Sequence, residues 1–144
     1  MDKKLIPFGV GNNKFEFCDL YTRAKDIIHV KRYGGSSVFS HLFAQGTASA
    51  ELFQTQPAIR DLVNQKLPPS HKLAESAKRP NPGEYRVVFA VVSDSEEPDL
   101  TVPFFSRLNL RSAVRRLDGY GYQVAITKIS VSKNLSKLKR YDPW

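Results

Sequence analysis

The fold is decided by Y-R-V-V-F-A-V-V-S at residues 85–93, an almost continuous apolar run. A strand that is covered on both faces reads this way, whereas a half-exposed strand alternates apolar and polar residues. The run therefore predicts a central strand, buried between its neighbours in a sheet.

The chain after this run predicts a helix and a second strand. Residues 109–118 begin with Asn109 as a candidate N-cap and end before Gly119, and residues 122–131 read as a strand. Apolar side chains recur at helical spacing between the two ends, at Leu110, Ala113, Val114 and Leu117. A strand, a helix and a strand in this order predict a right-handed βαβ crossover.

The N-terminal part predicts three antiparallel strands over residues 4–8, 14–22 and 26–33. The second and third alternate apolar and polar residues, and turn-forming residues separate all three. Gly34 and Gly35 then end the sheet, and either Ser36 or Ser37 provides a helix cap.

Two helices come next, over residues 38–53 and, beginning near Pro57, up to about residue 67. Gly46 marks a kink or a break in the first of them. Residues 68–84 form a loop that is long for a compact domain and is therefore either mobile or functional. The predicted class is α/β: a mixed sheet made of an antiparallel three-strand meander, a helix and a strand-helix-strand unit, with helices packed on it.

Composition narrows the class of protein. The 144 residues fit a single domain, residues 1–144, with a basic tail from about residue 132. No apolar run is long enough to span a membrane, and the first residues lack a signal-peptide core. The only cysteine, Cys18, excludes an internal disulfide and favours a reducing cytoplasm. A net charge of +8 favours nucleic acid as the partner, although solubility alone also explains such a charge.

Polar side chains on the second and third predicted strands form a candidate metal site. If the turn is centred on Ala24, Asp19 faces His29 on the neighbouring strand, and Lys31 shares the face of His29. One metal ion could then reach both Asp19 and His29, with the Lys31 ammonium beside a phosphate or an attacking water. Glu16 falls on the opposite face of the strand, unless a bulge turns it inward.

These residues also resemble a known nuclease core. The run C-D-L at 18–20, a turn, I-H-V-K at 28–31, a helix and a buried strand are similar to the restriction-endonuclease-like, PD-(D/E)XK, fold. The resemblance implies that Asp19 binds a divalent metal, that Lys31 assists the chemistry and that Gln45 matches the Gln of some branches. His29 stands where that family has Glu or Asp. This replacement either favours the softer Mn²⁺, Co²⁺ or Zn²⁺ over Mg²⁺ or means that catalysis has been lost.

A longer string resembles the C-terminal part of a sporadically distributed family of uncharacterised bacterial proteins. It runs from K-L-I-P-F-G at 4–9 through H-V-K-R-Y-G-G at 29–35 to P-F-F-S-R-L-N-L-R at 103–111. The resemblance implies a context of prokaryotic defence or mobile elements. It also implies that the chain is a fragment or a short relative, so that a second copy or a partner chain could supply a missing N-terminal portion.

Basic side chains provide candidate contacts to nucleic acid, with DNA expected in preference to RNA. They are Arg32, the group Arg111, Arg115 and Arg116, and Lys137, Lys139 and Arg140 of the tail.

We therefore expect a nuclease that hydrolyses phosphodiester bonds with one Mn²⁺ or Mg²⁺ ion held by Asp19 and His29. The alternative is a non-catalytic nucleic-acid-binding or assembly module on the same scaffold. Each residue also has an ordinary structural explanation: Asp19 as a hydrogen-bond acceptor at a turn, His29 as a core residue, and Lys31 with Arg32 as a solvated sheet edge.

Overall fold

A computed structural model describes residues 6–7 and 14–131 of the chain. The strands are β1 (Ile6–Pro7), β2 (Lys14–Phe15), β3 (Leu20–Tyr21), β4 (Asp26–Arg32), β5 (Arg86–Ser93) and β6 (Gln123–Ser130). The helices are α1 (Ser36–Thr55), α2 (Pro57–Lys66) and α3 (Phe104–Tyr120), with short 3-10 turns at η1 (Pro69–His71) and η2 (Pro82–Glu84).

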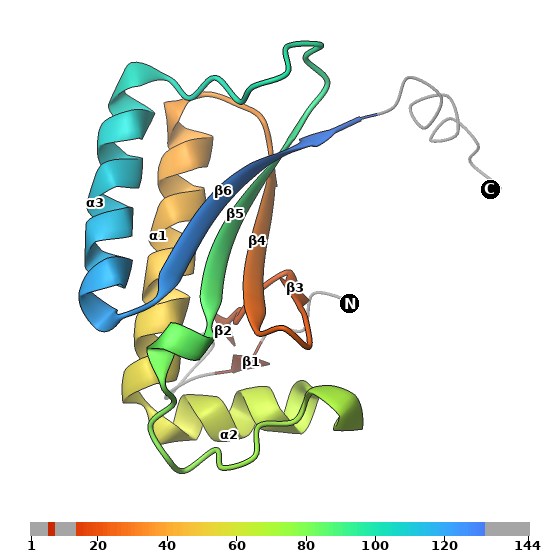
Figure 1. The fold of residues 1–144 in the computed structure, drawn as a ribbon, viewed down its shortest axis with the longest axis vertical. Coiled ribbons are helices and arrows are strands. Elements are labelled where there is room, and N and C mark those ends of the chain that lie inside the picture. The colour runs from red at the N-terminus through yellow and green to blue at the C-terminus, as the bar shows by residue number, and fades with distance from the viewer. Residues whose placement is uncertain (1–5, 8–13, 132–144) are drawn as a thin grey trace, which may run out of the picture.

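Four strands form the main sheet in the order β3-β4-β5-β6 (Figure 1). β3 is antiparallel to β4, whereas β4, β5 and β6 are parallel. The predicted central strand is confirmed, because β5 lies between β4 and β6 and residues 87–91 are all buried. The connection from β4 to β5 and the connection from β5 to β6 both lead to the next strand on the same side. Their helices, α1 and α3, therefore cover the same face of the sheet (Figure 1).

The core lies between this face and α1. Phe39, Phe43 and Phe53 of α1 are buried, and the Phe43 ring meets the Phe89 ring of β5 edge-on at 5.2 Å between centroids. Gly46 lies inside an unbroken helix, so the predicted kink or break is absent there. Its role is steric, because a Cβ at this position would lie 2.4 Å from the Phe89 ring. The glycine therefore lets the helix backbone approach the sheet.

The predicted three-strand meander is wrong. The stretch 14–22 is split into β2 and β3, and β2 pairs with β1 in a separate two-stranded sheet. Only β3 joins β4. The neighbours Phe17 and Cys18 are both buried, and a continuous strand would have placed them on opposite faces. The chain is not in strand conformation between Phe15 and Leu20, and there both side chains are buried.

Two helix ends differ from their predicted positions. α3 begins at Phe104, and Asn109 lies inside it, where its side chain donates to Ser40 Oγ at 2.8 Å instead of capping. Gly121, with φ of 96°, ends this helix, and Gly119 is an interior residue.

The predicted serine cap of α1 is also wrong. Gly35 occupies the N-cap position of this helix, and no side chain makes a capping hydrogen bond there.

Some sequence predictions lie outside the described residues. These are the outer parts of the first predicted strand, at 4–5 and 8, and the basic tail with Lys137, Lys139 and Arg140. Within residues 6–7 and 14–131, no helix combines the length and the apolar character that crossing a bilayer requires.

The contact at Gly46 gives a first testable prediction. Gly46→Ala should lower the free energy of unfolding by about 1–3 kcal/mol, because the new methyl group overlaps the enclosed Phe89 ring. Gly119→Ala is the matched control: no atom lies within 4 Å of its Cβ position, so helix propensity should raise stability by about 0.5–1 kcal/mol. Urea denaturation measures both, and an unchanged Gly46→Ala midpoint would contradict the steric role.

Candidate functional site

The edge of β4 carries the first predicted site residue, Asp19. The predicted hairpin register is confirmed, because Leu20 pairs with Ile28 and Tyr21 with Ile27. The chain bends away at Asp19, and the carboxylate Oδ2 of this residue accepts a hydrogen bond from the Val30 backbone N–H at 2.7 Å. Asp19 thus lies just outside β3 at the level of His29 and Val30, and its backbone N–H donates to the Ile28 carbonyl of β4 at 3.0 Å.

His29 lies beneath α1 and is completely buried. Its Nε2 is 3.2 Å from Ser49 Oγ, and the Ser49 hydroxyl donates to the Gly46 carbonyl. This network assigns the ring proton to Nε2, which donates to Oγ and leaves a lone pair on Nδ1. Nδ1 has no hydrogen-bond partner among the described residues. Burial lowers the pKa of His29 to about 4, against the opposing effect of the Asp19 charge, so the ring is neutral at pH 7.

Glu16 and Gln45 join the same region. Gln45 of α1 donates from Nε2 to Glu16 Oε2 at 3.2 Å, and its own Oε1 is buried without a partner among the described residues. The alternation of an unbroken strand placed Glu16 on the opposite face, and the break before Leu20 turns it toward α1 instead. The consecutive apolar pair Phe17 and Cys18 was the only sequence signal for this break.

Cys18 lies between Glu16 and Asp19 in the chain and feels the charge of both carboxylates. Burial, with smaller effects of the Asp19 and Glu16 charges, raises the pKa of its thiol to about 12. The thiol is therefore protonated at pH 7 and packs as a small apolar group, as its predicted place opposite Asp19 implied.

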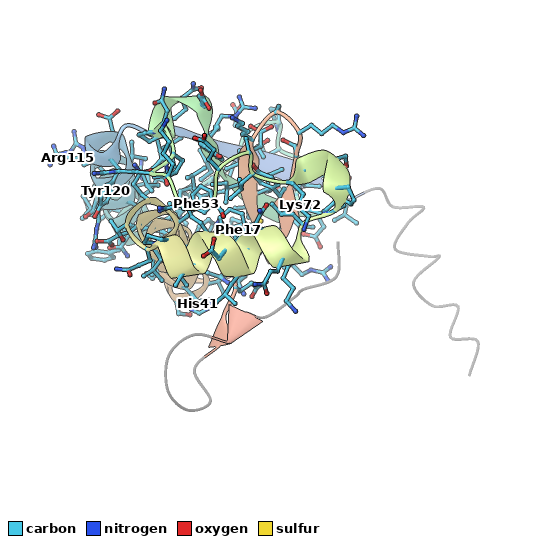
Figure 2. All side chains as sticks on the ribbon, turned by 90° about the horizontal axis from the view of Figure 1, so that it is seen from below. Phe17, His41, Phe53, Lys72, Arg115 and Tyr120 are labelled. Carbon is cyan, nitrogen blue, oxygen red and sulfur yellow. The ribbon has the colours of Figure 1, made fainter. Side chains whose placement is uncertain are left out.

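Lys31 follows His29 by two residues on β4 and shares its face, half-buried. It makes no ion pair with any described carboxylate. We call the set Glu16, Asp19, His29, Lys31 and Gln45 the edge cluster. Arg32, the next residue, is exposed, and His41 of α1 is also exposed (Figure 2).

The edge cluster fits a hard divalent metal better than a soft one. Glu16 and Asp19 carry carboxylate oxygens, and Gln45 Oε1 is an unsatisfied amide oxygen in a side chain bonded to Glu16. Among the described residues no three His, Cys, Asp or Glu side chains converge into a metal-binding group. Mg²⁺ is commonly held by one or two carboxylates, with waters and substrate phosphates completing its octahedron. Oxygen donors of these types could hold such a partly hydrated ion.

Arginines on α3 form the second predicted site. Arg111, Arg115 and Arg116 are all exposed, but Arg116 is paired with Glu51 at 2.6 Å. Arg107, which the sequence reading left out, is exposed one turn before Arg111, and its guanidinium lies 5.7 Å from the Phe104 ring centroid. We call Arg107, Arg111 and Arg115 the arginine stripe, since a spacing of four residues places them along one side of α3. Figure 2 shows Arg115 at the outer side of this helix.

The pKa of His29 gives a second prediction. The folded-state pKa of about 4 lies below the ordinary value of 6.5, so the unfolded chain binds a proton between these pH values that the folded chain does not. Stability should therefore fall as pH decreases through this window, by about 2 kcal/mol at pH 5 from this group. Denaturation should be measured at pH 7 and pH 5. Between these pH values the free energy of unfolding should fall less for His29→Gln than for the wild type, whereas for His41→Gln it should fall as much as for the wild type. Equal losses in the wild type and His29→Gln would show that His29 titrates normally.

Comparison with known proteins identifies a family. No curated protein and no solved structure matches the chain significantly. The sequence profile described as "Family of unknown function (DUF6119)" matches residues 1–130, which is most of the chain. The chain therefore belongs to the DUF6119 family.

Proposed function

We propose that this chain is a restriction-endonuclease-like domain that binds nucleic acid and hydrolyses phosphodiester bonds with a divalent metal. The observation that carries the proposal is the edge cluster, in which Asp19 bonds the backbone of the strand that bears Lys31, and Glu16 bonds Gln45 of the helix packed on that strand. The element order supports it, since an antiparallel pair, a helix and a parallel buried strand is the arrangement that the nuclease resemblance implies. We place this activity in the cytoplasm, in prokaryotic defence, with DNA as the preferred substrate.

The residues of the edge cluster have distinct roles in this proposal. Asp19 and Glu16 hold the metal, and the Gln45 amide oxygen completes its protein ligands. A bound metal supplies a polarised water and stabilises negative charge on the phosphate. Lys31 has no carboxylate partner among residues 6–7 and 14–131, and it stabilises the charge that develops as water attacks phosphorus and the P–O bond to the leaving oxygen breaks.

His29 has a supporting role that departs from the sequence prediction. Its Nε2 is occupied by Ser49, and the ring is completely enclosed. We therefore propose that His29 positions α1 against β4 through its contact with Ser49, and that oxygen ligands would hold the ion. Oxygen donors favour Mg²⁺ or Mn²⁺.

One observation favours a second candidate, the non-catalytic binding module. His29 occupies the position where the nuclease resemblance requires an acid, and it is buried as a neutral side chain in the core. In this alternative the edge cluster only stabilises the edge of β4, and the arginine stripe binds nucleic acid. The two candidates differ in one measurable property, which is turnover.

Cleavage assays test the proposed activity. The wild-type chain should cleave DNA or RNA with Mg²⁺ or Mn²⁺ but not with EDTA. Asp19→Asn, which keeps an oxygen acceptor for the Val30 N–H, should lower the cleavage rate at least about 100-fold, as should Lys31→Ala. Asp118→Asn is the control, because this exposed carboxylate on α3 lies outside the cluster. Binding without cleavage in any metal would instead favour the non-catalytic module.

Salt-dependent binding tests the arginine stripe. Affinity for nucleic acid should fall linearly in a log–log plot against salt, because each neutralised phosphate releases counterions. The double change Arg111→Glu with Arg115→Glu should weaken binding to all sequences alike and reduce the slope by about two. Lys66→Glu, on α2, is the control for charge reversal elsewhere. An unchanged salt slope in the double variant would show that nucleic acid does not bind at the arginine stripe of α3.

A further inference from the structure

A cavity of about 450 Å³ lies at the amino ends of the parallel strands, away from the edge cluster. Its walls come from the turn between β3 and β4, from the end of α1 and from the loop 68–84. None of the residues of the edge cluster lines it. Figure 2 views the molecule from this end and labels Phe53 and Lys72, which both line the cavity. Its volume is within the range of small-molecule sites, about 300–1,000 Å³.

Arg60 of α2 is the unusual group in this wall. It is buried, at 3% exposure, and its guanidinium donates only to backbone carbonyls. The acceptors are the carbonyls of Phe53, Gln54, Ser76 and Ala77. No described carboxylate neutralises it. Four of the five guanidinium N–H groups are therefore occupied by carbonyls, and Arg60 contributes its positive charge to the cavity and not a free fork of donors.

The other cations that line the cavity divide into two groups. Lys25 is paired with Glu84 at 2.7 Å, and Lys78 with Glu75 at 3.5 Å. Arg23, Lys72 and Arg79 line the cavity without a carboxylate partner in the described part of the chain. Together with Arg60 they leave an excess of positive charge around the cavity. This charge suits a phosphate better than a single carboxylate, because the guanidinium groups of Arg23 and Arg79 can bind phosphate oxygens in pairs.

The remaining walls are aromatic and apolar. Tyr21, His71, Phe53 and Tyr85 all line the cavity, and the rings of Tyr21 and His71 lie 6.2 Å apart between centroids with their planes tilted by 55°. Flat rings of this kind stack against a planar ligand. A ligand that binds both the cationic and the aromatic side chains of the cavity carries a phosphate and a planar ring.

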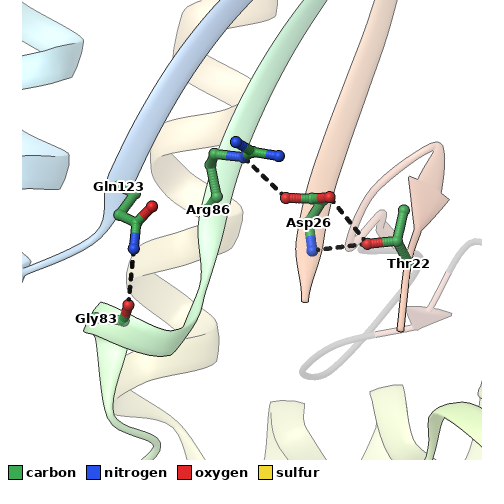
Figure 3. A network of polar contacts seen from close by, with 5 residues as sticks. All are labelled: Thr22, Asp26, Gly83, Arg86 and Gln123. Carbon is green, nitrogen blue, oxygen red and sulfur yellow. Dashed lines mark hydrogen bonds and ion pairs between the residues drawn. The ribbon is translucent and has the colours of Figure 1, made fainter. Parts of the chain in front are cut away.

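The cavity is held in a fixed shape by its surroundings. Two contacts to Asp26 close the turn that carries Arg23 (Figure 3). The Thr22 hydroxyl lies 3.1 Å from the Asp26 carboxylate, and Arg86 donates to the same carboxylate at 2.9 Å. On the opposite side, Gln54 donates to the Pro80 carbonyl at 3.1 Å. The predicted long loop is thus fastened at several points, which favours a functional loop over a mobile one.

From this arrangement we propose that the cavity binds a nucleoside phosphate, with the phosphate at Arg79 and Arg23, the charge of Arg60 in the wall behind them, and the base against the rings that line the cavity. The ligand is either a free nucleotide or the 5′-phosphorylated end of a strand. The proposal does not depend on the proposed nuclease activity, because the residues are different.

Isothermal titration calorimetry of the full chain with AMP, ATP, adenosine and inorganic phosphate tests this site, without divalent metal. AMP and ATP should bind at least about tenfold more tightly than either adenosine or phosphate alone. Arg79→Ala and Arg23→Ala should each weaken nucleotide binding about tenfold or more. Lys66→Ala, an exposed cation on α2 that does not line the cavity, should leave the Kd unchanged. Thermal melts of each variant verify that it is folded.

A competition arm distinguishes the two sources of the phosphate. Displacement of AMP by a 5′-phosphorylated oligonucleotide, but not by its unphosphorylated twin, supports a strand end, and no displacement by either supports a free nucleotide. The proposal is overturned if nucleotides bind no more tightly than inorganic phosphate, if they fail to bind at millimolar concentration, or if both arginine variants retain the wild-type Kd. A negative cleavage assay leaves these outcomes unaffected, because no strand is cut in the titration.

Discussion

The close approach of α1 to the sheet at Gly46 is the constraint on which the rest of the structure depends. Because this residue has no side chain, the Phe89 ring and His29 fit beneath the helix, and the aromatic core closes around them. The neighbouring residue Gln45 is thereby brought to the edge of β4, where it bonds Glu16. One backbone contact therefore sets both the packing of the core and the composition of the edge cluster.

Sequence reasoning succeeded where a local pattern fixes the outcome. The apolar run of β5 can only be satisfied by a covered strand, and the short turn after Tyr21 fixes the register with β4. It failed where tertiary packing overrides a pattern. Glu16 was placed on the wrong face because alternation was extended across Phe17 and Cys18, which are both drawn into the core.

Charge illustrates a second limit of sequence reasoning. The excess of Lys and Arg predicts a polyanionic partner, but it does not tell which cations are free to meet it. Arg116 and Arg86 are each neutralised by an acid at least 60 positions away in the chain. Only the fold shows that unmatched cations remain on the outer side of α3 and around the cavity near Arg60.

The fastening of the loop 68–84 by Arg60 also has a kinetic consequence. Four carbonyl contacts hold two segments of the chain together around one side chain, so the wall of the cavity is in place before any ligand arrives. Association then requires no slow closure step, and diffusion with electrostatic steering by the surrounding cations sets its rate. Selectivity in such a site depends on the dissociation rate, since anions of suitable size associate at similar rates.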